Sequence, residues 1–123
     1  MEKLLWVGLG GALGAICRYL LGLLPMRTAF PFVTLGINFT GAVLIGFVAC
    51  AAICTGLSEN LVLFLKTGFC GGFTTFSAFS LETFQLLENG KPGYGLVYAF
   101  ASVFFCIFGV WIGGELSAFF LTR

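Results

Sequence analysis

The sequence contains no histidine and very few charged residues. Its 123 residues include five acids and six bases, so only 9% of the chain is charged and the net charge is +1. Without histidine, catalysis by a histidine-dependent triad or acid/base pair is excluded, and a zinc or haem site is disfavoured. The near-zero net charge argues against a nucleic-acid partner. No nucleophile–base pair or cluster of metal ligands stands out, so we do not expect an enzyme.

The sequence also lacks any CxxC pair, although it has five cysteines. All five lie inside apolar segments: Cys17, Cys50, Cys54, Cys70 and Cys106. Free cysteine behaves as a small, usually buried hydrophobic side chain. We therefore predict that these residues fill space in the interior.

Apolar residues dominate what is present. They make up 59% of the chain, and the mean hydropathy is +1.08. A soluble domain of this length could not bury so much apolar surface. Four segments are long enough to cross a bilayer as helices: about 4–24, 32–55, 61–87 and 94–121. The first also resembles a signal peptide, but its length and Arg18 favour a membrane helix. We expect an all-α membrane protein whose residues 1–123 form one four-helix domain.

Short links separate the four segments, and short links favour antiparallel neighbours. Glycine is frequent, with 18 residues. Three pairs have the small-xxx-small spacing that lets helices approach closely: Gly10 with Gly14, Gly68 with Gly72, and Gly109 with Gly113. This spacing predicts either tight packing within one subunit or association between subunits, and does not separate the two.

The positive charges are distributed almost evenly between the two sides of the predicted membrane domain. Lys3, Lys66 and Arg123 fall on one side, and Arg27 and Lys91 on the other, with Arg18 near them. The positive-inside rule therefore gives almost no preferred orientation. Either the protein simply has few charges, or the chain inserts both ways and pairs with an inverted copy of itself. Many transporters contain two inverted repeats, and a second subunit could supply the missing one.

The segment Gly68–Ser80, "GFCGGFTTFSAFS", is unusually rich in glycine and hydroxyl side chains for a membrane span. Gly71 and Gly72 each weaken a helix by roughly 1 kcal/mol relative to alanine. Thr74, Thr75 and Ser77 suit the start of a new helix as capping residues. We predict that the third helix is broken near residues 71–75, because irregular membrane backbone survives where it faces protein or a polar cavity. The alternative is a continuous helix whose glycines serve packing.

After the predicted break, phenyl rings and hydroxyls occupy adjoining helix faces. Phe76 and Phe79 are three residues apart and share one face, and Ser77 and Ser80 share the next. Ring edges carry partial positive charge, and hydroxyls donate hydrogen bonds. These faces suit a narrow, dehydrated anion path.

The segment Gly68–Ser80 resembles the signature of the Fluc (CrcB) fluoride channels. "GGALGAICRY", residues 10–19, and "TLGINFTGAVLIG", residues 34–46, resemble that family's first-helix and second-helix motifs. The resemblance implies a dual-topology, antiparallel homodimer in the bacterial plasma membrane. It also implies two pores, passive and selective passage of fluoride, and lower cytoplasmic fluoride toxicity.

The resemblance also implies roles for particular residues. The fluoride pathway would comprise Asn38, Thr75, Phe76, Ser77, Phe79, Tyr98 and Ser102. The carbonyls of Gly71 and Thr74 would bind a structural Na⁺ at the dimer interface. Cys106 stands where the family commonly has a further hydroxyl, and a thiol is a weaker donor.

Two ionisable residues within the apolar segments remain. Arg18 is equally compatible with a vestibule that attracts fluoride and with a membrane-edge anchor. For Glu82 we favour a hydrogen-bonding structural or vestibule role over direct handling of the ion. The rival functions are a small proton-coupled dual-topology exporter and a non-transporting accessory protein. Such an exporter typically needs a membrane-embedded acid in its first helix, where this chain has Arg18.

Overall fold

The computed structural model describes residues 1–122, and all regular structure in that range is helical. The helices are α1 (Glu2–Gly22), α2 (Phe32–Thr55), α3 (Glu59–Val62), the π-helix η1 (Leu63–Cys70), α4 (Gly71–Phe73), α5 (Phe76–Glu88) and α6 (Pro92–Leu121). Within this range, four helical stretches are long and apolar enough to cross a membrane: 2–22, 32–55, 59–88 and 92–121. The protein is therefore an all-α, multi-pass membrane protein. The expected ranges differ from these bounds by at most two residues.

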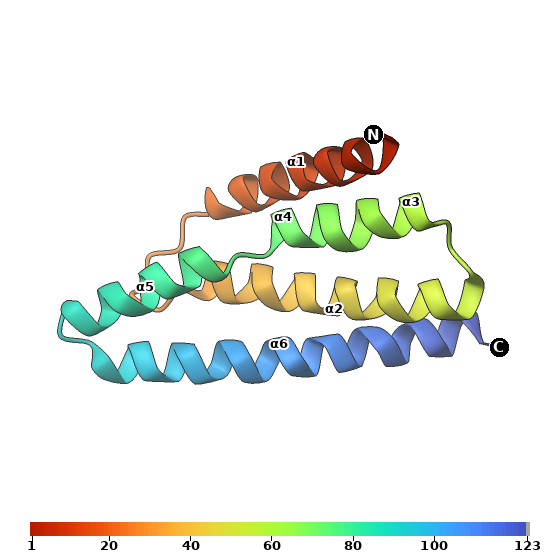
Figure 1. The fold of residues 1–123 in the computed structure, drawn as a ribbon. Helices are drawn as coiled ribbons and strands as arrows, with labels where there is room; N and C mark the ends of the chain where they lie inside the picture. The colour runs from red at the N-terminus through yellow and green to blue at the C-terminus, as the bar shows by residue number, and fades with distance from the viewer. Residues whose placement is uncertain (123) are drawn as a thin grey trace.

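The four spans lie side by side, and the third span lies between α1 and α2 (Figure 1). α1 packs mainly on η1 and α4, whereas α2 packs mainly on α6. The N-terminus and the C-terminal end of α6 lie at the same end of the molecule (Figure 1). This arrangement follows from four spans joined by short links.

Glycines bring the backbones of each packed pair into direct contact. A Cβ atom on Gly10 or Gly14 would collide with backbone atoms of residues 64–73, and one on Gly68 would lie 2.8 Å from the Val7 carbonyl oxygen. On the other pair, a Cβ atom on Gly113 would lie 2.7 Å from the Phe47 amide nitrogen. All three small-xxx-small pairs thus serve packing within one subunit, and the alternative of subunit association is not needed to explain them.

The third span, residues 59–88, is interrupted after α4. Thr74 has φ −79° and ψ 157°, and Thr75 has φ −149° and ψ 116°, so both are extended. Gly71 and Gly72 belong to α4 and remain helical. The interruption therefore lies at the two threonines, toward the end of the expected 71–75 window, and the glycine pair does not itself unwind.

Polar contacts join the N-terminal ends of α1 and of the third span. Lys3 Nζ lies 2.6 Å from Glu59 Oε1, and Asn60 Nδ2 donates to Glu2 Oε1 at 2.7 Å. These two contacts fix the N-terminal ends of α1 and α3 beside each other.

Glycines shape two of the links between spans. Gly56 and Gly90 adopt positive φ in the second and third links, which glycine does at little steric cost.

Candidate functional site

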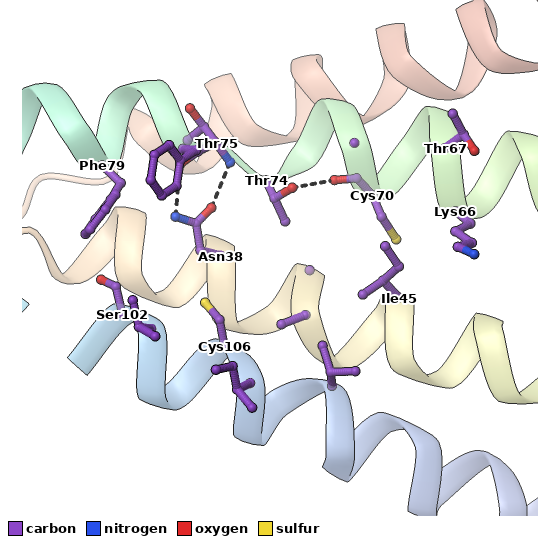
Figure 2. Close-up of a pocket in the computed structure, with 17 residues that line it drawn as sticks. Asn38, Ile45, Lys66, Thr67, Cys70, Thr74, Thr75, Phe79, Ser102 and Cys106 are labelled. Atoms are coloured by element: carbon purple, nitrogen blue, oxygen red, sulfur yellow. Dashed lines mark hydrogen bonds between the residues drawn. The ribbon is translucent and has the colours of Figure 1, made fainter. Parts of the chain in front are cut away.

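A groove of about 660 Å³ runs along α2, the interrupted third span and α6 (Figure 2). Its walls are mostly apolar, with polar and aromatic groups gathered beside the interruption. These groups belong to Asn38, Thr74, Thr75, Phe76, Phe79, Ser102 and Cys106. An apolar cleft with a few convergent polar groups is the usual form of a ligand site.

The side chain of Asn38 holds the interruption at two points. The Thr75 amide donates to Asn38 Oδ1 at 2.8 Å, and Asn38 Nδ2 donates to the Thr75 carbonyl at 3.1 Å (Figure 2). The Thr75 amide can only donate, so it fixes which end of the Asn38 amide carries the oxygen. One of the two N–H groups of Asn38 Nδ2 is used in this pair, and the other remains for a ligand.

The two threonines replace helical hydrogen bonds with side-chain ones. Thr75 Oγ1 accepts from the Ala78 amide at 3.1 Å and so caps the start of α5. In a continuous helix that amide would donate to the Thr74 carbonyl, and the Thr75 amide would donate to the Gly71 carbonyl. Both amides have other partners, so the carbonyls of Gly71 and Thr74 lose their helical donors.

Arg18 supports the same interruption from α1. Its Nε donates to the Gly72 carbonyl at 3.1 Å, and its side chain is half-buried. A charged donor on a carbonyl makes a strong hydrogen bond. Arg18 therefore caps the C-terminal end of α4, although it does not line the groove.

The rings of Phe76 and Phe79 form the aromatic part of the groove. Their centroids are 5.2 Å apart with planes tilted by 48°, and Phe79 lies 5.2 Å from the Tyr98 ring. Phe76 is 78% exposed, so little of its ring is covered by the rest of the chain. An exposed ring can present its positive edge to an anion.

α6 contributes hydroxyl and thiol groups to the opposite wall. Ser102 is buried, and its Oγ has no hydrogen-bond partner among the residues that the structure describes. Cys106 lies one turn further along, and Figure 2 shows both side chains on the side of α6 that faces the groove. A buried hydroxyl without a partner is costly, and the Ser102 hydroxyl is free to donate to a ligand in the groove.

A second polar cluster surrounds Glu82 on α5. Thr34 Oγ1 donates to one carboxylate oxygen at 2.7 Å, and the Tyr98 hydroxyl donates to the other at 2.6 Å. Tyr98 is fully buried. Glu82 also lines a separate cavity of about 280 Å³, together with Gln85, Asn89 and Lys91. The carboxylate therefore has hydrogen-bond partners on both oxygens, at the edge of a vestibule-like hollow.

The structure brings together most of the predicted site. Asn38, Thr75, Phe76, Phe79 and Ser102 line the groove, as do the predicted cation ligands Gly71 and Thr74. Ser77 and Tyr98 do not line it. Ser77 Oγ instead lies 3.2 Å from Thr75 Oγ1, and the Tyr98 hydroxyl points to Glu82.

Thr34 was not among the predicted site residues, and the predicted burial of the cysteines was only partly right. Thr34, the second partner of Glu82, lies one helical turn before Asn38 on α2, and this i, i+4 spacing was the available signal. The prediction that the five cysteines fill space in the interior is wrong for Cys54, which is exposed. Cys70 is buried, whereas Cys17, Cys50 and Cys106 are only half-buried. Within residues 1–122, no three cysteine, aspartate or glutamate side chains form a metal-binding group.

Known proteins resemble the chain over nearly its whole length. Residues 5–114 match the family model described as "CrcB-like protein, Camphor Resistance (CrcB)". A protein of Rhizobium meliloti, named fluoride-specific ion channel FluC, is 47% identical over 92% of this chain and 94% of its own. Proteins with the same name from Thermus thermophilus and Chlorobium chlorochromatii are 44% and 43% identical. They cover 95% and 89% of this chain, and 96% and 88% of their own lengths. With this likeness and its four membrane-spanning stretches, the chain belongs to the CrcB family.

Proposed function

We propose that this protein is a channel that passes fluoride passively and selectively across the membrane. The groove beside Asn38, Phe76, Phe79 and Ser102 carries the proposal, because it gathers hydrogen-bond donors and ring edges on an apolar surface. The names of the similar proteins support the same ion. The proton-coupled exporter is not favoured, and no acid lies inside α1 beyond Glu2 at its first position.

The chemistry of the groove suits a small, strongly hydrated anion. The free N–H of Asn38 and the unpartnered hydroxyl of Ser102 can replace part of the water shell. The ring edges of Phe76 and Phe79 supply weaker contacts on other sides and exclude water. Glu82 does not line the groove, so its carboxyl group lies outside the proposed path.

We further propose that two chains pair in opposite orientations in the membrane, each supplying one pathway. The nearly balanced positive charges support this, because they give insertion no preferred direction. The exposed Phe76 and the open groove support it as well, since both would gain cover from a second subunit. Reporters fused to the C-terminus are expected on both sides of the membrane in comparable amounts. A single orientation would contradict the antiparallel arrangement.

A structural Na⁺ at the two-fold axis of this dimer fits the backbone of the interruption. Gly71 and Thr74 carry carbonyls without helical donors, and two copies would offer four oxygen ligands. Such oxygens suit a hard cation rather than zinc. We propose that Na⁺ binds to these carbonyls and thereby keeps the interruption open in the assembled channel. Thr74→Ser keeps the carbonyl and is expected to be mild. A density map that shows an unbroken helix there would contradict the proposal.

The decisive experiment is fluoride efflux from liposomes. Purified protein in vesicles loaded with fluoride is expected to release it down its gradient, measured with a fluoride electrode. Chloride-loaded vesicles are the matched control and should retain their ion. Equal release of both ions, or fluoride release only with an opposing proton gradient, would overturn the proposal. In a cell, such a channel in the bacterial plasma membrane would discharge fluoride that accumulates inside.

A further inference from the structure

Two cysteines form a close pair at the end of α2, away from the groove. Cys50 Sγ and Cys54 Sγ lie 3.7 Å apart, one helical turn from each other. Cys54 is exposed and Cys50 is half-buried. Neither residue lines the groove or the second cavity. The pair therefore has no part in the proposed fluoride path.

A direct disulfide between these two residues is disfavoured by helix geometry. Residues four apart on a helix have Cβ atoms about 5–6 Å apart, whereas a disulfide requires about 3.5–4.5 Å. Closing that gap would distort the last turns of α2, which are regular up to Thr55. The two thiols are thus held close to each other without being able to join.

A single bridging metal atom has no such difficulty. Two sulfur atoms 3.7 Å apart, each about 2.3 Å from a shared metal, subtend an angle of about 107° at it. That angle is close to tetrahedral, which is the geometry Zn²⁺ adopts with thiolate ligands. The side chains can bind in this way with little change of rotamer.

We propose that Cys50 and Cys54 form a binding site for a thiophilic divalent cation of the Zn²⁺ and Cd²⁺ class. Both thiols lose their protons on binding, so two protons are released for each metal ion. The resulting unit of one M²⁺ and two thiolates is electrically neutral, and water fills the remaining coordination positions. Neutrality suits a site at the edge of an apolar span, where an isolated charge would be costly.

The position of the pair on α2 adds a second, independent argument. Cys54 lies in the last turn of the helix, which ends at Thr55 and is followed by Gly56 in a left-handed conformation. The carbonyl end of a helix carries partial negative charge. This field disfavours isolated thiolates. The unit of one M²⁺ and two thiolates carries no net charge, so it avoids that cost.

Titration with Cd²⁺ tests the proposal directly. Reduced, detergent-purified protein is expected to develop an ultraviolet thiolate-to-cadmium absorption band that saturates at one Cd²⁺ per chain. Cys50→Ser and Cys54→Ser should each weaken binding by about 100-fold, because each leaves one ligand where two were linked. Cys17→Ser, on α1, is the matched control and should retain the band.

A second measurement separates binding at this pair from binding elsewhere. Cd²⁺ should protect Cys54 from maleimide in the wild-type protein, and the Cys50→Ser change should abolish that protection. Detecting the label by mass spectrometry requires no transport activity, so this result is independent of fluoride flux. Wild-type Cd²⁺ binding in both single variants, or a missing band in the wild-type protein, would overturn the proposal.

Discussion

The third span and α6 cover 30 residues each, yet only the third is interrupted. Both contain two adjacent glycines: Gly71 with Gly72, and Gly113 with Gly114. Both glycine pairs are helical. The third span is interrupted instead at Thr74 and Thr75, where side-chain oxygens accept hydrogen bonds from the backbone amides. Weak helix formers are thus not sufficient for a break, because the freed polar groups must find partners in the membrane.

The two spans also carry their aromatic rings differently. Phe76 and Phe79 follow the interruption and line the groove, whereas Phe104 on α6 stacks on Phe108 with centroids 6.2 Å apart. Phe76→Ile and Phe79→Ile are expected nearly to abolish fluoride efflux while leaving a folded protein, because the ring edges are lost and the volume stays apolar. Phe104→Ile is the control and should keep wild-type flux. Wild-type efflux in both groove variants would show that the rings lie outside the path.

A substitution of Asn38, which holds the interruption by two hydrogen bonds, should have the next largest effect on fluoride efflux. In Asn38→Asp, the carboxylate can still accept from the Thr75 amide but cannot donate to the Thr75 carbonyl. We expect fluoride efflux to fall strongly and the free energy of unfolding to fall by about 1–3 kcal/mol, the usual cost of leaving a polar group without its hydrogen-bond partner. Thr40→Val serves as the control, because Thr40 is an exposed residue on the same helix as Asn38. Unchanged efflux in Asn38→Asp would show that the paired hydrogen bonds between Asn38 and Thr75 are not needed for transport.

The glycine pairs allow a matched test of packing. A Cβ atom at Gly113 would strike the backbone of α2, whereas Gly114 has nothing within 4 Å. Gly113→Ala should lower the unfolding free energy by about 1–3 kcal/mol through overpacking, and Gly114→Ala should leave it unchanged or raise it slightly. Gly72→Ala should behave like Gly113→Ala, since its Cβ atom would strike the Gly11 carbonyl. Thermal unfolding in detergent measures all three, and equal effects at Gly113 and Gly114 would contradict the packing assignment.

Two bonds from α1 to the third span should differ in strength. Arg18→Met removes a half-buried donor from the Gly72 carbonyl and should cost about 1–3 kcal/mol. Lys3→Met removes an ion pair to Glu59 in which both side chains are mostly exposed, and should cost less than about 1 kcal/mol. High salt should weaken the Lys3 contact and leave that of Arg18 nearly unchanged. A larger loss from Lys3→Met would reverse this ranking.

Much of the fold could be predicted from the sequence, because apolar length fixes the spans and short links fix their order. The position of the interruption was predicted only to within a few residues. Glycine content pointed to residues 71 and 72, but the outcome depends on Asn38 and Arg18, which approach from other helices. Likewise, the Thr34 and Tyr98 hydroxyls meet Glu82 only once three helices have packed. The helix propensity of a local segment carries no information about such tertiary contacts.

The bond between Asn38 and Thr75 has a consequence for the biogenesis of the protein. It joins residues 37 positions apart on separate spans. A newly inserted third span would meet lipid before meeting α2, and a break there would leave amides and carbonyls unsatisfied in hydrocarbon. We therefore expect the nascent segment to enter the bilayer as a continuous helix. We expect it to open at Thr74 and Thr75 only when α2 and α1 dock, so that the order of assembly determines when the interruption appears.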